Sequence, residues 1–172
     1  MLILSKNLIY TIENLSELAN LDVLDLNDNR ILKIENLNGL TNLRILNLSN
    51  NLITALNLPY CLKNLQELNL RKNFISEIQP NISLPSLQRL YLSNNKLQSL
   101  ERLSDSLPCL SEVTLENNPI EKSATLLKDL KHQFPSLQYY NLQKMQSLIA
   151  NMASSMHQSN FESLSQKQQQ MA

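Results

Sequence analysis

The chain has 172 residues, a length typical of one domain, and 42% of them are hydrophobic, which is enough for a core. Aromatic residues make up only 5% and tryptophan is absent, so the core must consist mainly of leucine and isoleucine. The 15 basic and 15 acidic residues give a net charge of zero, which removes the usual electrostatic reason to expect binding to nucleic acid or an anionic membrane.

The start of the chain, Met1 to Ser5, lacks the basic flank and the long apolar stretch of a signal peptide. No apolar run approaches the roughly 20 residues that a membrane helix needs. The two cysteines, Cys61 and Cys109, lie far apart and in no metal-ligand spacing, so we expect reduced thiols. These features predict a cytoplasmic protein with no membrane segment.

The sequence opens directly at a predicted strand, in which Leu2 and Leu4 occupy the apolar positions. The half-repeat that precedes each later strand is missing there. Because an uncovered first strand favours aggregation, we expect one of two arrangements. The favoured one is that this chain is part of a longer natural chain, and the other is that a partner covers the N-terminal edge by strand addition.

A period of 22 residues, lengthened to 23 in the last interval, dominates the chain. Its marker is an asparagine, at Asn7, Asn29, Asn51, Asn73, Asn95 and Asn118. The same apolar frame precedes the later asparagines: Leu21-Leu24-Leu26, Leu43-Leu46-Leu48, Leu65-Leu68-Leu70, Leu87-Leu90-Leu92 and Leu110-Val113-Leu115. Such a repeat predicts a stack of coils that share one continuous core.

Each part of the repeat has a physical interpretation. The alternation of Leu46 and Leu48 predicts a short strand with both leucines on one face. The amide of Asn51 can donate and accept, so it can bridge backbone groups of neighbouring coils. The later three-residue apolar spacing, as in Ile34 and Leu37, favours 3₁₀ turns on the convex side.

The regularity ends after Asn118-Pro119. We expect a cap helix over residues 123–134, with Ser123 as its N-cap and Pro135 as its stop. The frame then recurs once more in a last strand, at Leu137, Tyr140 and Leu142. Such a cap closes the core of a solenoid, and it ends the predicted repeat domain, 1–142.

The remaining residues differ in composition. Over 143–158 the spacing of apolar residues predicts an amphipathic helix, either packed on the cap, which we favour, or offering a methionine-rich face to a partner. These apolar residues are Met145, Leu148, Ile149, Met152 and Met156. The glutamine-rich stretch 159–172 predicts a disordered tail.

The frame from residue 1 to 142 resembles the 22-residue leucine-rich-repeat class that includes the regulatory subunit of type-one protein phosphatase, an axonemal dynein light chain and a spliceosomal A-prime protein. The run from Asn118 to Asn141 is similar to the cap of that class, which usually carries aspartate where this chain has Asn141. The resemblance implies an α/β solenoid with a parallel concave sheet of about seven short strands, 3₁₀ turns on the convex side and a helical C-terminal cap.

A narrower resemblance is to the leucine-rich subunit of the tubulin polyglutamylase complex. It rests on the runs 65–73, 84–93 and 110–120. It implies a non-catalytic scaffold subunit of a ciliary or microtubule-associated assembly, located in the cilium, axoneme or centriole.

The sequence offers no pattern for catalysis, a metal or a cofactor. A phosphate-cradling loop needs several glycines, and Gly39 is the only one. The histidines, His132 and His157, have no ligand or catalytic partner at a suitable spacing, and solvated charge accounts for the acidic residues. We therefore expect a protein that is not an enzyme.

Alignment of the strands predicts the residues that face away from the leucine core, on the concave sheet. We expect one or more protein partners there, including a helix that lies in the concave groove, because a sheet roughly 29 Å across accommodates a helix of about 10–12 Å diameter. The predicted contact residues are Val23, Asp25, Ile45, Asn47, Glu67, Asn69, Arg71, Arg89, Tyr91, Glu112, Thr114 and Tyr139. Tyr91 and Arg89 are the strongest candidates for interface anchors. The alternative is that Glu67, Arg89 and Glu112 only neutralise one another.

Three functions remain open. The leading one is a scaffold subunit of a larger assembly. The second is a regulatory module of an enzyme such as a phosphatase, or an axonemal dynein-associated subunit. The third, a protein of an RNA particle, is disfavoured by the zero net charge and the lack of a basic stripe.

Overall fold

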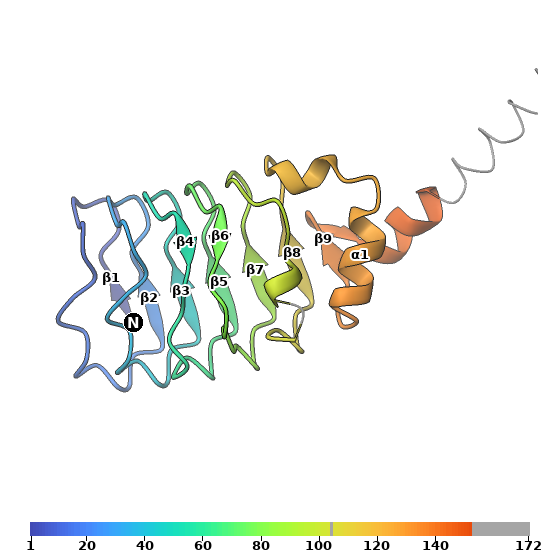
Figure 1. Cartoon of the computed structure of the whole chain (residues 1–172). Helices are drawn as coiled ribbons and strands as arrows, with labels where there is room; N and C mark the ends of the chain where they lie inside the picture. Colours follow the sequence, from blue (N-terminus) through green and yellow to red (C-terminus); the bar gives the residue numbers. More distant parts are fainter. Residues whose placement is uncertain (104, 153–172) are drawn as a thin grey trace, which may run out of the picture.

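The computed structural model describes residues 1–103 and 105–152. Figure 1 shows a stack of coils that follow one another in chain order, from the blue N-terminal coil to the orange cap at the opposite end. The elements are β1 (Leu2–Ile3), β2 (Val23–Asp25), β3 (Ile45–Asn47), β4 (Ala55–Leu56), β5 (Glu67–Asn69), β6 (Glu77–Ile78), β7 (Arg89–Tyr91), η1 (Glu101–Leu103), β8 (Glu112–Thr114), η2 (Pro119–Lys122), α1 (Leu126–Gln133), β9 (Tyr139–Tyr140) and β10 (Gln143–Lys144).

The main sheet has the order β1-β2-β3-β5-β7-β8-β9-β10 within the described residues. Neighbours from β1 to β9 pair in parallel, and β10 pairs antiparallel to β9. Paired residues of neighbouring strands occupy equivalent positions of the repeat, since Leu24 lies beside Leu46 and Leu46 beside Leu68. These leucines are fully buried, because alternate residues of a strand point to the same face. The predicted solenoid with about seven parallel strands is confirmed.

A ladder of asparagine side chains joins consecutive coils on the C-terminal side of the strands. In Asn51, Nδ2 donates to the carbonyls of Leu48 in its own coil (3.1 Å) and Leu26 in the coil before (3.0 Å). Its Oδ1 accepts from the Ile31 N–H at 2.9 Å. Asn29, Asn73, Asn95 and Asn118 repeat this pattern. The bridging role predicted for Asn51 is confirmed, and these amides satisfy backbone groups that would otherwise be buried without partners.

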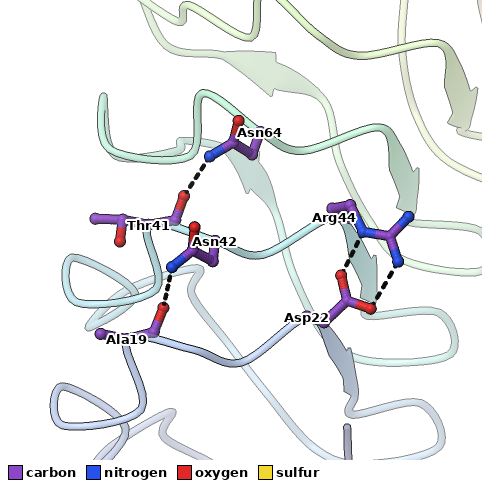
Figure 2. A network of polar contacts seen from close by, with 6 residues as sticks. All are labelled: Ala19, Asp22, Thr41, Asn42, Arg44 and Asn64. Atoms are coloured by element: carbon purple, nitrogen blue, oxygen red, sulfur yellow. Dashed lines mark hydrogen bonds and ion pairs between the residues drawn. The ribbon is translucent and has the colours of Figure 1, made fainter.

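A second set of polar contacts joins the coils ahead of the strands (Figure 2). Asn42 Nδ2 donates to the Ala19 carbonyl, and Asn64 Nδ2 donates to the Thr41 carbonyl, both at 2.9 Å. Arg44 binds Asp22 of the preceding coil through two nitrogens, and this bond holds the pKa of Asp22 below its ordinary value. Side chains therefore join neighbouring coils at both ends of the strands.

The convex side consists mainly of isolated turns rather than 3₁₀ helices. The Leu40 and Leu43 N–H groups donate to the carbonyls three residues earlier, Leu37 and Leu40, which is the 3₁₀ pattern in single turns. Among the described coils only one carries an assigned 3₁₀ helix on this side, η1, while β4 and β6 form a two-stranded parallel sheet. The three-residue spacing thus predicts the local bonds, but most of them do not extend into a helix.

One place on the convex side requires glycine. A Cβ atom added to Gly39 would lie 2.1 Å from the carbonyl oxygen of Ser16 and 2.8 Å from its carbonyl carbon. Ser16 belongs to the preceding coil, so two backbones approach each other closely at this point. Only a residue without a side chain fits there.

The cap differs from the prediction at its start. The predicted helix covers 123–134, whereas α1 begins at Leu126 and has Thr125 at its N-cap position, with no side-chain cap. Ser123 instead ends η2, which occupies the residues just before it. The apolar face is as expected, since Leu126, Leu130 and Phe134 are buried. The prediction of Ser123 as the helix N-cap is wrong because a 3₁₀ helix already uses that turn.

The chain after β9 turns back instead of continuing the frame. Asn141 and Leu142 have φ values of 47° and 65°, and Tyr140 pairs with Gln143 across them. This is a two-residue hairpin whose central residues both have positive φ, as a type I′ turn requires. Leu142 is 68% exposed, so the expectation that it belongs to the apolar frame is wrong.

The hairpin leads to a last helical segment. Residues 145–152 are helical, whereas 143–144 of the predicted helix form β10. Met145 is buried against the cap, and Ile149 and Met152 are exposed. Residues 153–158 of the predicted helix and the predicted tail 159–172 lie outside the described residues.

Leu142 offers a simple route to a more stable protein. Replacing Leu142 by glycine will raise the free energy of unfolding by about 0.5–1 kcal/mol, because a left-handed backbone strains a leucine but not a glycine. Little packing is lost, since the side chain is exposed. Chemical denaturation measures the gain, and Leu142→Ala is the control, because alanine keeps the strain. A glycine variant no more stable than the alanine variant would contradict this account of the turn.

Candidate protein interface

The outward residues of the main sheet form two rows on the concave face. Strand register places one row along Val23, Ile45, Glu67, Arg89, Glu112 and Tyr139. It places the other along Ile3, Asp25, Asn47, Asn69, Tyr91 and Thr114. These residues occupy neighbouring positions of one sheet, as the repeat predicts.

The C-terminal half of this face is charged. Arg89 Nε donates to Glu67 Oε2 at 2.8 Å, and both side chains are partly exposed. The bond raises the pKa of Arg89 above its ordinary value. Glu112 lies beside Arg89 on the other side. The pairing of Arg89 with Glu67 agrees with the mutual neutralisation considered from the sequence, so Arg89 is only partly available to a partner.

Tyr91 and Arg71 form a separate pair. The guanidinium carbon of Arg71 lies 4.2 Å from the centroid of the Tyr91 ring, within the range of a cation–π contact. Both residues are half-buried. Burial, followed by the charges of Glu112 and Glu67, raises the pKa of Tyr91, so the phenol remains protonated at neutral pH. The pair presents an aromatic ring, a hydroxyl and a cation in one fixed arrangement.

Three polar residues of the second row use their acceptors locally. Oδ1 of Asp25, Asn47 and Asn69 each accepts the backbone N–H two residues later, at 3.0, 3.1 and 3.2 Å respectively. Such turns fix the course of the chain as it leaves the strand. The side chains remain half-exposed, but a partner would have to compete for these oxygen atoms or share them.

Thr114 does not belong to the accessible surface. It is completely buried, and its Oγ1 accepts a hydrogen bond from Ser93 Oγ at 2.9 Å. The prediction that Thr114 contacts a partner is therefore wrong. A threonine is small enough for the neighbouring side chains to cover it. The position of Thr114 in the repeat does not reveal this burial.

The N-terminal half of the concave face is apolar. Ile3 is 54% exposed, and Val23 and Ile45 are half-buried beside it. The face is therefore graded along the solenoid, from aliphatic side chains at one end to the Tyr91–Arg71 pair and the charged residues at the other.

The cap closes the far end with a polar cluster. The Tyr140 hydroxyl donates to Glu121 Oε1 at 3.3 Å, and Asn141 Oδ1 accepts from the Leu115 N–H at 2.7 Å. Burial, with the charge of Glu121, raises the pKa of Tyr140 to about 12. Asn141 thus has a structural role in the cap. Tyr139, the last member of the first row, is half-exposed.

Residues 1–103 and 105–152 contain no group of three or more histidine, cysteine, aspartate or glutamate side chains able to hold a metal ion. Cys61 and Cys109 are both free, and burial raises the pKa of the Cys61 thiol. His132 is exposed on α1, and His157 lies outside the described residues. No helix in the described part of the chain is long and apolar enough to cross a membrane.

Sequence reasoning missed a second surface. The residue directly after each asparagine that marks the repeat, Asn7 included, is exposed, and in three coils it is apolar: Leu8, Leu52 and Phe74. The position is exposed, so the core does not need an apolar residue there. Leucine or phenylalanine at an exposed position of the repeat is the sequence signal that identifies this surface.

Two family models match the chain. One, described as "Leucine rich repeat", matches residues 63–120, and the other, "Leucine Rich repeats (2 copies)", matches 41–83. The comparison with curated proteins finds no match.

Several solved structures are similar to the chain. A chain of the Drosophila melanogaster SNF/U2A′ complex is 26% identical with a TM-score of 0.56, covering 82% of this chain and 71% of that one. A chain of the TLR13–ssRNA13 complex is 34% identical with a TM-score of 0.71, but this chain spans only 21% of its length while 81% of this chain is covered. An internalin from Listeria monocytogenes, 24% identical over 80% of this chain and 46% of its own, shares the fold with a TM-score of 0.52.

Proposed function

This chain is a leucine-rich-repeat protein, a class that generally mediates protein–protein interaction, and we propose that it is a non-catalytic scaffold that binds a helix of another protein on its concave face. The observation that carries the proposal is the Tyr91–Arg71 pair, held at 4.2 Å on the concave sheet next to an apolar half. Tyrosine and arginine are among the residues that contribute most to binding at protein interfaces.

The pair is already ordered before a partner arrives. Arg71 loses side-chain freedom when its guanidinium stacks on the ring, so less entropy remains to be lost on binding. The Arg71 backbone is fixed as well, since its N–H donates to Asn69 Oδ1 at 3.2 Å and its carbonyl accepts from the Asn50 N–H at 2.8 Å. Pre-ordered anchors of this kind raise affinity without any additional contact.

The graded surface indicates what the partner helix looks like. One end should carry aliphatic residues against Ile3, Val23 and Ile45, and the other should carry hydrogen-bonding groups for Tyr91 and Arg71. The acidic residues Glu67 and Glu112 offset the basic ones on this face, so the concave sheet has no basic stripe of the kind that nucleic acid requires. This supports a protein partner on the concave face.

At a finer level, we propose a subunit of a microtubule-associated assembly of the tubulin polyglutamylase type, in the cytoplasm and at the cilium, axoneme or centriole. The support is the resemblance of the runs 65–73, 84–93 and 110–120. The second candidate is a regulatory module of an enzyme such as a protein phosphatase, or a dynein-associated subunit, which the same 22-residue frame favours. In the first case a stable stoichiometric complex forms; in the second, the turnover of the bound enzyme changes.

The test begins with affinity purification of the protein from ciliated cells and mass spectrometry of what remains bound. Binding of the identified partner is then measured with Tyr91→Ala combined with Arg71→Ala, for which we expect a loss of at least about tenfold in affinity, since each hot-spot truncation costs about 2 kcal/mol. The matched control is Tyr60→Ala, an exposed tyrosine outside the strands.

Arg89→Glu is a poor test by comparison. It would remove the ion pair with Glu67 and place like charges on three adjacent strands, which destabilises a sheet. If the folded Tyr91/Arg71 double variant binds as tightly as the wild type, the interface lies elsewhere. A ligase that modifies tubulin among the bound proteins supports the finer proposal, whereas phosphatase or dynein subunits favour the second candidate.

A further inference from the structure

The residues that flank the repeat-marking asparagines, from Asn7 to Asn95, form a second surface along one side of the solenoid, which we call the lateral rim. It consists of the residue before and the residue after each asparagine in the first five coils: Lys6, Leu8, Asp28, Arg30, Asn50, Leu52, Lys72, Phe74, Asn94 and Lys96. The residues before and after the asparagines form two columns. A groove lies between these columns, and asparagines such as Asn51 and Asn73 are among its lining residues.

The backbone of the rim is rigid. The residues before the asparagines have positive φ, for example 54° at Asn50 and 55° at Lys72, which turns the chain sharply out of the strand. The residues after the asparagines are fixed to the preceding coil, since the Leu52 N–H donates to Ile31 at 2.9 Å and the Phe74 N–H to Ile53 at 2.8 Å. The exposed side chains therefore stand at fixed positions from coil to coil.

The rim is apolar at its centre. Leu8 is 66%, Leu52 39% and Phe74 51% exposed, and Tyr10 and Leu32 extend the apolar area two positions further along their coils. Leu52 and Phe74 follow equivalent asparagines in adjacent coils, so they stand side by side. Contiguous exposed apolar side chains with a polar border are typical of interaction sites.

The rim also carries positive charge, although the whole chain is neutral. Lys6, Arg30, Lys72 and Lys96 are basic, against one acidic residue, Asp28, whose Oδ1 accepts from Asn50 Nδ2. The difference of four and one leaves an excess of three positive charges beside the apolar centre. A complementary partner must offer apolar side chains flanked by acidic ones.

The spacing of the coils selects the form of that partner. Neighbouring coils lie about 4.8 Å apart, close to the pitch of about 5.4 Å of an α-helix. Over three intervals the mismatch is only about 2 Å. An extended peptide running along the rim would instead present a side chain every 6.6 Å or so and lose register with the coils.

We propose that the lateral rim binds an acidic amphipathic helix of a protein partner, lying along the solenoid axis. The site is independent of the concave face, so the chain can join two partners at once. Protein is favoured over single-stranded nucleic acid because most of the apolar side chains, Leu8, Leu32 and Leu52, provide no ring for base stacking. Phe74 offers one exposed ring, whereas single-stranded nucleic acid uses a series of rings for successive bases. The Tyr10 ring is already in contact with Arg30, whose Nη1 donates to the Tyr10 hydroxyl at 2.8 Å.

The test uses fluorescence anisotropy of the full chain with defined probes. The first probe is a synthetic helix of about 18 residues, or five turns, with leucine on one face and glutamate on its flanks. The second carries lysine in place of every glutamate, and the third is a uridine oligonucleotide of about 12 nucleotides. We expect the acidic helix to bind at least about tenfold more tightly than the basic one, and more weakly as salt is added.

Variants locate the binding. Leu52→Ser with Phe74→Ser should weaken binding of the acidic helix at least about tenfold, and Lys72→Glu about fivefold, with melting temperature nearly unchanged because all three side chains are exposed. Lys63→Glu, an exposed lysine outside the rim, and Tyr91→Ala on the concave face are controls that should leave binding unchanged. The proposal would be overturned if the two helices bound equally, if neither bound, if the oligonucleotide bound more tightly, or if the rim variants had no effect. Sensitivity to Tyr91→Ala would instead assign the helix to the concave face.

Discussion

Replacing Asn73 by alanine will lower the free energy of unfolding by about 2–4 kcal/mol, because a buried donor left without a partner costs about 1–3 kcal/mol and each further hydrogen bond lost costs about 0.5–1.5 kcal/mol. The Asn73 amide serves three buried backbone groups. Its Nδ2 donates to the carbonyls of Leu48 (3.0 Å) and Leu70 (3.1 Å), and its Oδ1 accepts from the Ile53 N–H (3.0 Å). Alanine leaves the Ile53 N–H without its acceptor, whereas the Leu48 and Leu70 carbonyls lose one bond each but still accept from Asn51 and Asn95. Water has little access to a residue that is 4% exposed.

Urea denaturation followed by circular dichroism measures this loss. Asn57→Ala is the matched control, since Asn57 is an exposed asparagine outside the ladder, and it should change the free energy of unfolding by less than about 0.5 kcal/mol. Amide hydrogen exchange gives a second readout, because the Ile53 N–H should exchange faster in the Asn73 variant. A loss below about 1 kcal/mol would mean that water replaces the amide in the ladder.

Gly39→Ala should cost at least about 2 kcal/mol of stability through a different mechanism, the overpacking of a rigid contact. The added methyl group would lie 2.1 Å from the Ser16 carbonyl oxygen, which belongs to backbone and not to a flexible side chain. Relief requires the first two full coils to move apart, and the core that they share would then lose contacts. The same denaturation experiment measures the effect.

The control for this substitution is the neighbouring residue. Asn38 is exposed, so Asn38→Ala should leave the free energy of unfolding nearly unchanged. A Gly39→Ala variant as stable as the wild type would show that the convex turns shift freely, and that the close approach of the two coils is not required.

The repeat made most of the fold predictable from the sequence. A frame such as Leu43-Leu46-Leu48 followed by Asn51 specifies both the strand and the bond that joins it to the preceding coil, because one register satisfies burial and hydrogen bonding at the same time. The departures lie where the repeat ends. At Ser123 and Leu142 a 3₁₀ helix and a tight hairpin replace the frame, and local backbone geometry decides which residues are buried.

The candidate site was predictable in position but less so in detail. Strand alignment places Tyr91 and Arg89 on the concave face, yet it does not reveal that Arg89 is engaged by Glu67 or that Tyr91 stacks with Arg71, because rotamers decide those contacts. It also fails for Thr114, which neighbouring side chains cover. The helix in the groove, strand addition at the β1 edge and the absence of nucleic acid among the partners stay predictions.

The ladder has a consequence for how such a chain changes in length. Every ladder amide binds its own coil and the coil before it in the same geometry, so a coil meets the same groups whichever coil it follows. Duplication or deletion of one whole 22-residue unit in the middle of the stack therefore preserves the bonds of the ladder. Evolution can lengthen this protein by one coil at a time, widening its recognition surfaces in steps of about 4.8 Å without redesigning the core.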